Sequence, residues 1–227
     1  MSLHVSSAPH VHSKDSTQTI MRDVLIAMLP TTVMGVYAFG FNAALLCVLG
    51  VAAAILAEYG YQKMTRQRVR IGDLSAAVTG LLVALNLPGN APWWMPVVGS
   101  FIAIVLVKQL FGGLGKNPFN PALVGRVFLL IAYPVQMTTW PLPVNGSFDA
   151  LSGATPLAAV KNGACPNVLD VQDLVLGNIP GSLGEVAAAA LLCGFVYLPW
   201  RRVITWHIPV TVLVTMAVFA LVVALAG

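Results

Sequence analysis

The chain has 227 residues, of which 58% are hydrophobic and only 9% are charged. Soluble domains carry roughly one-quarter charged residues, so this composition excludes an ordinary soluble domain. The mean hydropathy of +0.83 predicts an integral membrane protein. The net charge of +4 does not indicate nucleic-acid binding, because cations that flank apolar spans usually set membrane topology.

Five apolar runs follow one another in the first part of the chain, and each predicts a membrane helix, so we expect an all-α, multi-spanning fold. Several runs are shorter than the ~20 residues that a straight crossing helix needs, which predicts short or broken helices. Trp93 and Trp94 precede the fourth run, where tryptophans commonly anchor a span at the membrane interface. The five expected spans are Val24 to Phe41, Phe41 or Ala43 to Ala57, Leu74 to Leu87, Met95 to Leu110, and Ala122 to Tyr133.

The second part of the chain begins with its most polar stretch and continues with two more apolar runs. We expect the sixth span from Val186 to Pro199 and the seventh from Val203 to Ala226. The predicted organisation is an N-terminal arm at 1–23, helices at 24–137, a loop at 138–184 and the last two spans at 185–227. The cysteines, Cys47, Cys165 and Cys193, show no ligand spacing, so we assign no metal site and no disulfide.

The cations are distributed very unevenly between the two sides of these spans. If the N-terminus is cytoplasmic, the opposite side holds Lys161 alone, and the other 11 of the 12 Lys and Arg residues share the cytoplasmic side. This bias predicts a cytoplasmic N-terminus and an extracytoplasmic loop at 138–184 in the cell (inner) membrane. The 11 residues are Lys14, Arg22, Lys63, Arg66, Arg68, Arg70, Lys108, Lys116, Arg126, Arg201 and Arg202.

The predicted loop contains the sequence Asp149-Ala150-Leu151-Ser152-Gly153-Ala154-Thr155-Pro156. One interpretation makes Thr155 an N-cap and Pro156 the first residue of a helix. A second is that Asp149, Ser152, Gly153, Ala154 and Thr155 resemble the acceptor sequence of flavin transferases, which join the phosphate of FMN to a threonine hydroxyl. The two are compatible, because the free N–H groups at a helix start favour a phosphate.

A Gly- and Pro-rich stretch from Gly112 to Pro121 predicts a helix break near the bilayer. Its backbone, with Asn117 or Asn120, could contact a flavin or line an ion path. Close packing between broken helices explains the same residues equally well, so both interpretations stay open.

Four charged residues adjoin or interrupt the expected spans. Lys108 and Arg126 are expected to extend toward the interface and to set topology. Glu58 and Glu185 are candidates for function because an ionisable group inside a membrane is costly, although their position at span ends weakens that interpretation.

Five motifs, in order along the chain, resemble the RnfD family, which forms the D subunit of the Rnf complexes. They are Ala8 to Ser13 with Asp15 to Thr17 and Ile20 to Ala27, Thr79 to Pro88, Gly112 to Leu123, the Asp149 to Thr155 loop, and Gly181 to Glu185. The resemblance covers essentially the whole chain. It implies a fold of two inverted repeats, of which this chain would hold the first and the start of the second.

The resemblance also implies a function. Rnf complexes couple electron transfer between ferredoxin and NAD to the movement of Na⁺ or H⁺ across a membrane, and the D subunit carries FMN covalently. Thr155 would then hold FMN through a phosphoester after the action of a flavin transferase, and the resemblance permits riboflavin as well. Implied partners are the A and E membrane subunits, the G flavoprotein, the peripheral B and C subunits, and membrane lipid. No catalytic residue toward NAD or ferredoxin is assigned.

Two departures and two alternatives accompany this resemblance. Val186 and Ala187 follow Glu185 where the family commonly has Thr-Ser, and the chain ends at Gly227 where the family continues, so we expect a truncated chain. One alternative is the related B subunit of a sodium-pumping NADH:quinone oxidoreductase. The other is a secondary transporter without cofactor that uses the broken helices.

Overall fold

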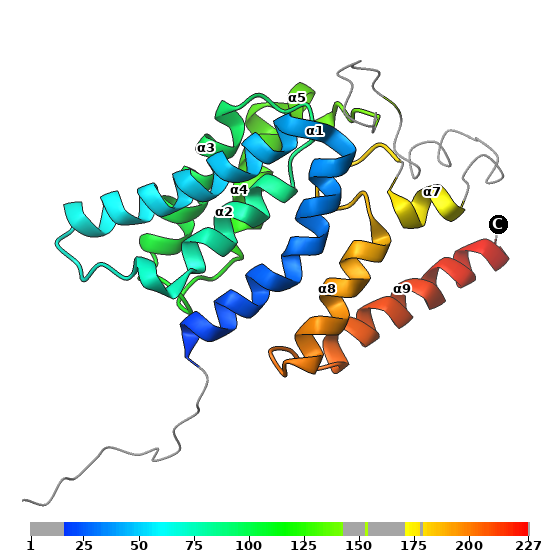
Figure 1. Cartoon of the computed structure of the whole chain (residues 1–227). Helices are drawn as coiled ribbons and strands as arrows, with labels where there is room; N and C mark the ends of the chain where they lie inside the picture. Colours follow the sequence, from blue (N-terminus) through cyan, green and yellow to red (C-terminus); the bar gives the residue numbers. More distant parts are fainter. Residues whose placement is uncertain (1–15, 143–152, 154–170, 178, 227) are drawn as a thin grey trace, which may run out of the picture.

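The computed structural model describes residues 16–142, 153, 171–177 and 179–226. Within these ranges the chain is helical without a β-strand, so the predicted all-α class is confirmed there (Figure 1). The described helices are α1 Thr17–Met64, the 3₁₀ turn η1 Ile71–Asp73, α2 Ser75–Leu85, α3 Trp94–Phe101, the π-helix η2 Ile102–Gln109, α4 Pro121–Ala132, α5 Pro134–Thr138, α7 Val171–Leu176, α8 Ala188–Trp200 and α9 His207–Ala226.

Helix α1 is bent into two halves at Gly40. This residue has φ 70° and ψ −155°, a backbone conformation that glycine adopts without a Cβ penalty. The break coincides with the expected boundary between the first two spans at Phe41, and Figure 1 shows the two halves running in different directions from it. Each half is close to the ~20 residues that cross a bilayer.

The start of α1 differs from the expected arm at 1–23. The helix already begins at Thr17, because the Oγ of Ser16 accepts a hydrogen bond from the N–H of Thr19 at 3.2 Å and caps it. Helices α2, α3 with η2, α4 and α8 begin and end within a few residues of the expected third to sixth spans, and α9 starts at His207, four residues after the expected Val203. The short elements η1, α5 and α7 correspond to no expected span, and α7 lies within the predicted loop.

By length and composition, α1 alone among the described helices qualifies as a membrane span. Five other helices are apolar but shorter, as the sequence predicts, while the seven crossings and the inverted repeat stay predictions. The shorter segments are Ser75–Leu85, Trp94–Gln109, Pro121–Ala132, Ala188–Trp200 and His207–Val223.

Small residues bring the helices of this bundle close together. A Cβ added to Gly50 of α1 would lie 2.8 Å from the carbonyl oxygen of Gly80 in α2, and one added to Gly125 of α4 would lie 2.8 Å from that of Gly99 in α3. The hydroxyl of Ser100 donates to the carbonyl of Gly50 at 3.0 Å, which adds a polar tie. Such small-residue contacts are typical of helix packing in membranes.

One end of the bundle is closed by two turns that are far apart in sequence, at 85–92 and 179–187, and we call it the bridge end. The N–H of Leu183 donates to the carbonyl of Leu87 at 3.0 Å, and that of Gly184 to Leu85 at 2.8 Å. Leu87 and Leu183 are fully buried in the main apolar core, which also includes Met95. These turns therefore lock α2 against the segment that leads into α8.

Candidate functional site

The predicted flavin-acceptor loop is described only at Gly153. Asp149, Ser152, Ala154 and Thr155 lie outside the described residues. The N–H of Gly153 donates to the carbonyl of Trp140 at 3.0 Å, and an added Cβ would lie 3.2 Å from Leu142 and 3.4 Å from Pro180. Pro180 belongs to the bridge end, so the one described residue of the motif lies at that end of the bundle.

The stretch between η2 and α4 breaks the helix, as the sequence predicted, and three of its glycines have positive φ. Gly112, Gly113 and Gly115 have φ values of 100°, 91° and 82°, in the region that favours glycine. Asn120 caps α4 by accepting a hydrogen bond from the N–H of Ala122 at 3.0 Å. The side-chain nitrogen of Asn117, in its hydrogen-bonded orientation, donates to the carbonyls of Lys108 at 3.2 Å and Gly113 at 2.9 Å.

These hydrogen bonds show that both asparagine side chains stabilise the backbone of the loop. The side-chain oxygen of Asn120 and the side-chain nitrogen of Asn117 are used by backbone groups. The close-packing interpretation therefore accounts for both side chains, while a contact with flavin stays a prediction.

The structure brings together a buried polar cluster at the opposite end of α2. The Nζ of Lys108 lies 2.8 Å from Oε2 of Glu58, and the two side chains are each 2% exposed. The Oε1 of Glu58 also accepts hydrogen bonds from Gln109 at 2.7 Å and Gln62 at 3.2 Å. The prediction that Lys108 extends to the interface is wrong, because its ammonium group is satisfied by a carboxylate inside the protein.

The π-helical turn η2 helps to explain this placement. Val107, Lys108 and Gln109 are three consecutive residues, and all three are buried. The wider turn of a π-helix is a frequent feature of functional sites, and here it accompanies two neighbouring polar side chains that both contact Glu58. No single-helix periodicity in the sequence indicates this cluster, because Glu58 lies 50 residues before Lys108.

The cluster continues toward the surface through hydroxyl and carboxylate groups. Lys108 donates to the Oγ of Ser75 at 2.6 Å, and this hydroxyl donates to Oδ1 of Asp73 at 2.7 Å. A continuous hydrogen-bonded chain thus joins the buried carboxylate of Glu58 to Asp73. Such a fully satisfied network fixes the relative positions of α1, α2 and η2.

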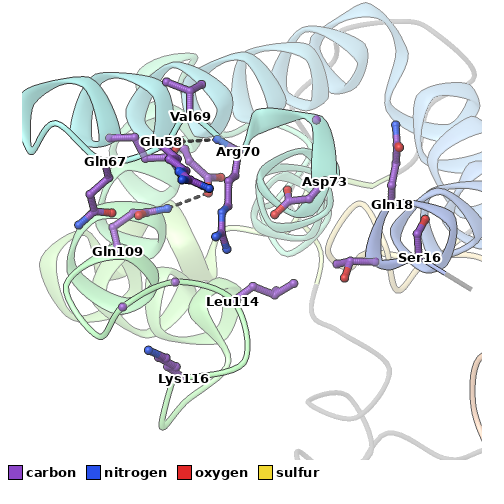
Figure 2. Close-up of a pocket in the computed structure, with 16 residues that line it drawn as sticks. Ser16, Gln18, Glu58, Gln67, Val69, Arg70, Asp73, Gln109, Leu114 and Lys116 are labelled. Carbon is purple, nitrogen blue, oxygen red and sulfur yellow. Dashed lines mark hydrogen bonds between the residues drawn. The ribbon is translucent and has the colours of Figure 1, made fainter. Parts of the chain in front are cut away.

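Glu58, Gln109 and Asp73 also line a cavity of about 1060 Å³. We call this end of the bundle, with the cavity and the polar cluster, the cavity end. Figure 2 shows Arg70 and Asp73 on one wall, Leu114 and Lys116 on the facing loop, and the start of α1 at a third side. The full lining is Ser16, Thr17, Gln18, Glu58, Gln62, Gln67, Arg68, Val69, Arg70, Gly72, Asp73, Gln109, Gly112, Gly113, Leu114 and Lys116.

Two further ion pairs connect helices elsewhere. Arg126, expected to extend toward the interface, donates to Oδ1 of Asn86 at 2.7 Å and to Oε1 of Glu185 at 3.3 Å. Near the start of α1, the buried Asp23 lies 3.2 Å from the guanidinium of Arg201, which follows α8. The sequence analysis named Glu185 and Arg126 separately, and only the structure shows that they form an ion pair.

A second, apolar cavity of about 310 Å³ lies between α1, α2 and α8. Its lining includes Ser182 at the bridge end, whose buried Oγ has no hydrogen-bond partner among the described residues. Sequence reasoning included Ser182 in the Gly181 to Glu185 motif but assigned it no role, since a serine in a Gly-rich turn carries no further signal.

Comparison with known proteins agrees with the resemblance in the sequence. The model of the NQR2, RnfD, RnfE family matches residues 4–226. The D subunit of the Na⁺-translocating ferredoxin:NAD⁺ oxidoreductase complex of Acetobacterium woodii is 45% identical over 226 residues, covering 98% of this chain and 70% of the relative.

Two other relatives are similar over most of the chain. The D subunit of the proton-translocating ferredoxin:NAD⁺ oxidoreductase complex of Clostridium ljungdahlii is 38% identical, covering 94% of this chain and 67% of the relative. The D subunit of an ion-translocating oxidoreductase complex of Halorhodospira halophila is 39% identical, covering 94% and 69%. With a family model that matches nearly its whole length and relatives of this similarity, the chain belongs to the NQR2, RnfD, RnfE family.

Proposed function

We propose that this chain is the flavin-carrying electron-transfer subunit of an ion-translocating ferredoxin:NAD oxidoreductase of the Rnf type. The observation that carries the proposal is the similarity to proteins named as the D subunit of such complexes over 94–98% of the chain. This similarity favours a translocase subunit over a secondary transporter without cofactor. Both ferredoxin-linked relatives favour it over the quinone-reducing alternative.

The coupling ion stays open in this proposal. One relative is named for Na⁺ and another for protons, although they are 45% and 38% identical to this chain. The ion therefore does not follow from overall similarity. The other subunits of the complex and the flavin transferase are partners that the proposal requires.

Thr155 is the residue that would hold FMN, through a phosphoester formed at its hydroxyl. The group would supply the redox ring, while the protein supplies its attachment and position. Asp149, Ser152, Gly153 and Ala154 complete the acceptor motif that a transferase would recognise. A Cβ added at Gly153 would be in ordinary contact with Pro180 at 3.4 Å, so the chain runs close to the bridge end at this residue of the motif.

The distribution of charge supports an extracytoplasmic position for this loop. The cavity-end segments carry Lys63, Arg66, Arg68, Arg70 and Lys116. Gly153 contacts the bridge end, at the other end of α2. Arg126 is an exception, because it contacts Asn86 and Glu185 at the bridge end. The cavity-end cations lie at the end opposite the acceptor motif, as the positive-inside rule requires of an outer flavin loop in the cytoplasmic membrane.

The decisive experiment is flavin fluorescence after denaturing electrophoresis of protein produced with its transferase. We expect a fluorescent band for the wild-type chain, with an intact mass raised by one FMN less water, and no band for Thr155→Val. Thr139→Val is the matched control, because this half-buried threonine precedes the acceptor motif along the chain and its hydroxyl donates to the carbonyl of Val135 at 2.7 Å. A wild-type chain without flavin, or flavin retained in Thr155→Val, would overturn the proposal.

A further inference from the structure

The cavity at the cavity end is lined by cations from two separate segments. Arg68 and Arg70 come from the turn after α1, and Lys116 comes from the loop after η2. The turn is held in place because the backbone N–H of Arg70 donates to the side-chain oxygen of Gln62 at 2.8 Å. The loop is held by the N–H of Gly113, which donates to the carbonyl of Lys108 at 2.9 Å.

These three cations have no acidic partner among the residues that the structure describes. Among the described residues, the ion pairs join Lys108 to Glu58, Arg126 to Glu185, and Arg201 to Asp23. Both carboxylates in the cavity lining are engaged elsewhere, since Glu58 binds Lys108 and Asp73 accepts from the N–H and Oγ of Ser75. Lys108 balances the charge of Glu58, so the three remaining cations face the single carboxylate of Asp73 and the cavity carries a net positive charge.

The same cavity has an apolar rim. Leu114 and Val69 line it and are 45% and 53% exposed. Phe111, on the same loop as Leu114, is 52% exposed. A small soluble anion would bind the cations and leave these side chains uncovered.

The location of the cavity also favours an occupant from the membrane. It opens where the apolar second half of α1 ends at Met64, and it includes Ser16 and Thr17 at the start of the first half. Both are places where an apolar helix passes from the hydrocarbon region to the polar surface. Basic pockets between membrane helices at the cytoplasmic surface are suited to anionic lipid headgroups.

We propose that this cavity binds an anionic phospholipid, with its phosphate between Arg68, Arg70 and Lys116 and its acyl chains along Leu114 and Phe111. The guanidinium groups supply charge-assisted hydrogen bonds to phosphate oxygens, and the lysine supplies a third positive charge. This inference does not depend on flavin attachment, so either assignment can fail without the other.

The test measures lipid retention by the purified complex that contains the full chain. The complex is incubated with an equimolar mixture of phosphatidylglycerol and phosphatidylcholine with the same acyl chains, washed, and analysed by native mass spectrometry. We expect the wild-type chain to retain phosphatidylglycerol in preference. In Arg68→Gln with Arg70→Gln, this preference falls about fivefold for each cation removed.

The matched control removes two nearby cations that do not line the cavity, Lys63 in the last turn of α1 and Arg66 in the turn after it, as Lys63→Gln with Arg66→Gln. Lys63 lies 5.7 Å from the ring centroid of Tyr59 rather than over the cavity. We expect this control to retain the lipid preference within about twofold of wild type. An equal loss in both double variants would assign the effect to general surface charge and overturn the site.

Two further measurements keep the result interpretable if the double variant folds poorly. Lys116→Gln on the opposite wall is expected to lower the preference alone, and no change there would contradict the proposed geometry. Inorganic phosphate and glycerophosphoglycerol, which lack acyl chains, are added as competitors. Displacement of the lipid by either at equal concentration would show that the cavity takes soluble phosphates and would overturn the lipid assignment.

Discussion

At the bridge end the two turns are joined by backbone hydrogen bonds and buried leucines, whereas at the cavity end the elements are joined by side-chain charges. Leu183 pairs with Leu87 through the main chain, and Glu58 pairs with Lys108 through side chains. Backbone hydrogen bonds can form with many different side chains, but the two backbone segments must lie close together. An ion pair can join residues that are far apart in sequence, but it requires both charged side chains.

The two kinds of contact lie at opposite ends of helix α2. Helix α2 begins at Ser75 in the polar cluster and ends at Leu85 in the bridge. The acceptor motif touches the bridge end through Gly153, and the unpaired cations surround the cavity at the other end. The closed end is therefore suited to fixing a loop, and the open, charged end to binding a ligand or a partner.

The largest expected effect concerns which side of the membrane each end faces. Cys165 lies in the predicted extracytoplasmic loop, outside the described residues, and we expect an impermeant maleimide to label it on intact cells. The reason is that 10 of the 12 cations, all except Lys161 and the bridge-end Arg126, are assigned to the opposite side. Labelling is measured by the mass shift of the purified chain.

The control for this experiment removes the thiol of Cys165 from the predicted loop and introduces a thiol at the cavity end. In a Cys165→Ser background, Arg66→Cys should react only after the membrane is opened. Cys193, which is exposed on α8, and the buried Cys47 stay in both variants and report any background reaction. The reverse labelling pattern would place the acceptor loop in the cytoplasm.

The next largest effect is the loss of charge pairing at the cavity end. Lys108→Met leaves the carboxylate of Glu58 buried without a cation, and we expect a cost of about 3–5 kcal/mol in the free energy of unfolding in mixed micelles. Adding Glu58→Gln removes the uncompensated charge and should recover at least half of that loss. A cost of less than about 1 kcal/mol for Lys108→Met would mean that the pair does not hold the helices.

A smaller effect is expected from crowding at the bridge end. In Gly35→Ala, the new Cβ would lie 2.7 Å from the carbonyl oxygen of Leu183, so the bridge must shift, at about 1–3 kcal/mol. Gly60→Ala is the matched control on the same helix, because no atom lies within 4 Å of its added Cβ. It should be stabilising by roughly 0.5–1 kcal/mol, through helix propensity. Equal destabilisation of the two variants, measured by thermal unfolding in detergent, would contradict close packing at the bridge.

Much of the fold could be predicted because local signals mark the helix ends. Gly40 marks the break in α1, and Asn120 followed by Pro121 marks the start of α4, where the asparagine caps the helix. The early start of α1 was missed although Ser16 is a good N-cap residue, since the apolar run begins only at Val24. Hydropathy identifies the membrane part of a helix and not its polar first turns.

The site was harder to predict because its residues come from distant segments. Lys108 alone looks like an interfacial cation, and its burial depends on Glu58 and Ser75 from two other elements. The pairing of Arg126 with Glu185 likewise joins residues that are 59 positions apart. The acceptor motif stays a prediction, and it could be proposed from the sequence alone because its residues are contiguous.

The bridge between the 85–92 and 179–187 turns also has a consequence for how the protein is made. Leu183 covers Gly35 and pairs with Leu87, yet it leaves the ribosome long after both. Until that later segment emerges, the carbonyls of Leu85 and Leu87 lack the hydrogen bonds that close this end of the bundle. Completion of the N-terminal bundle thus waits for translation to pass the acceptor loop, so the loop lies between two parts of the chain that assemble together.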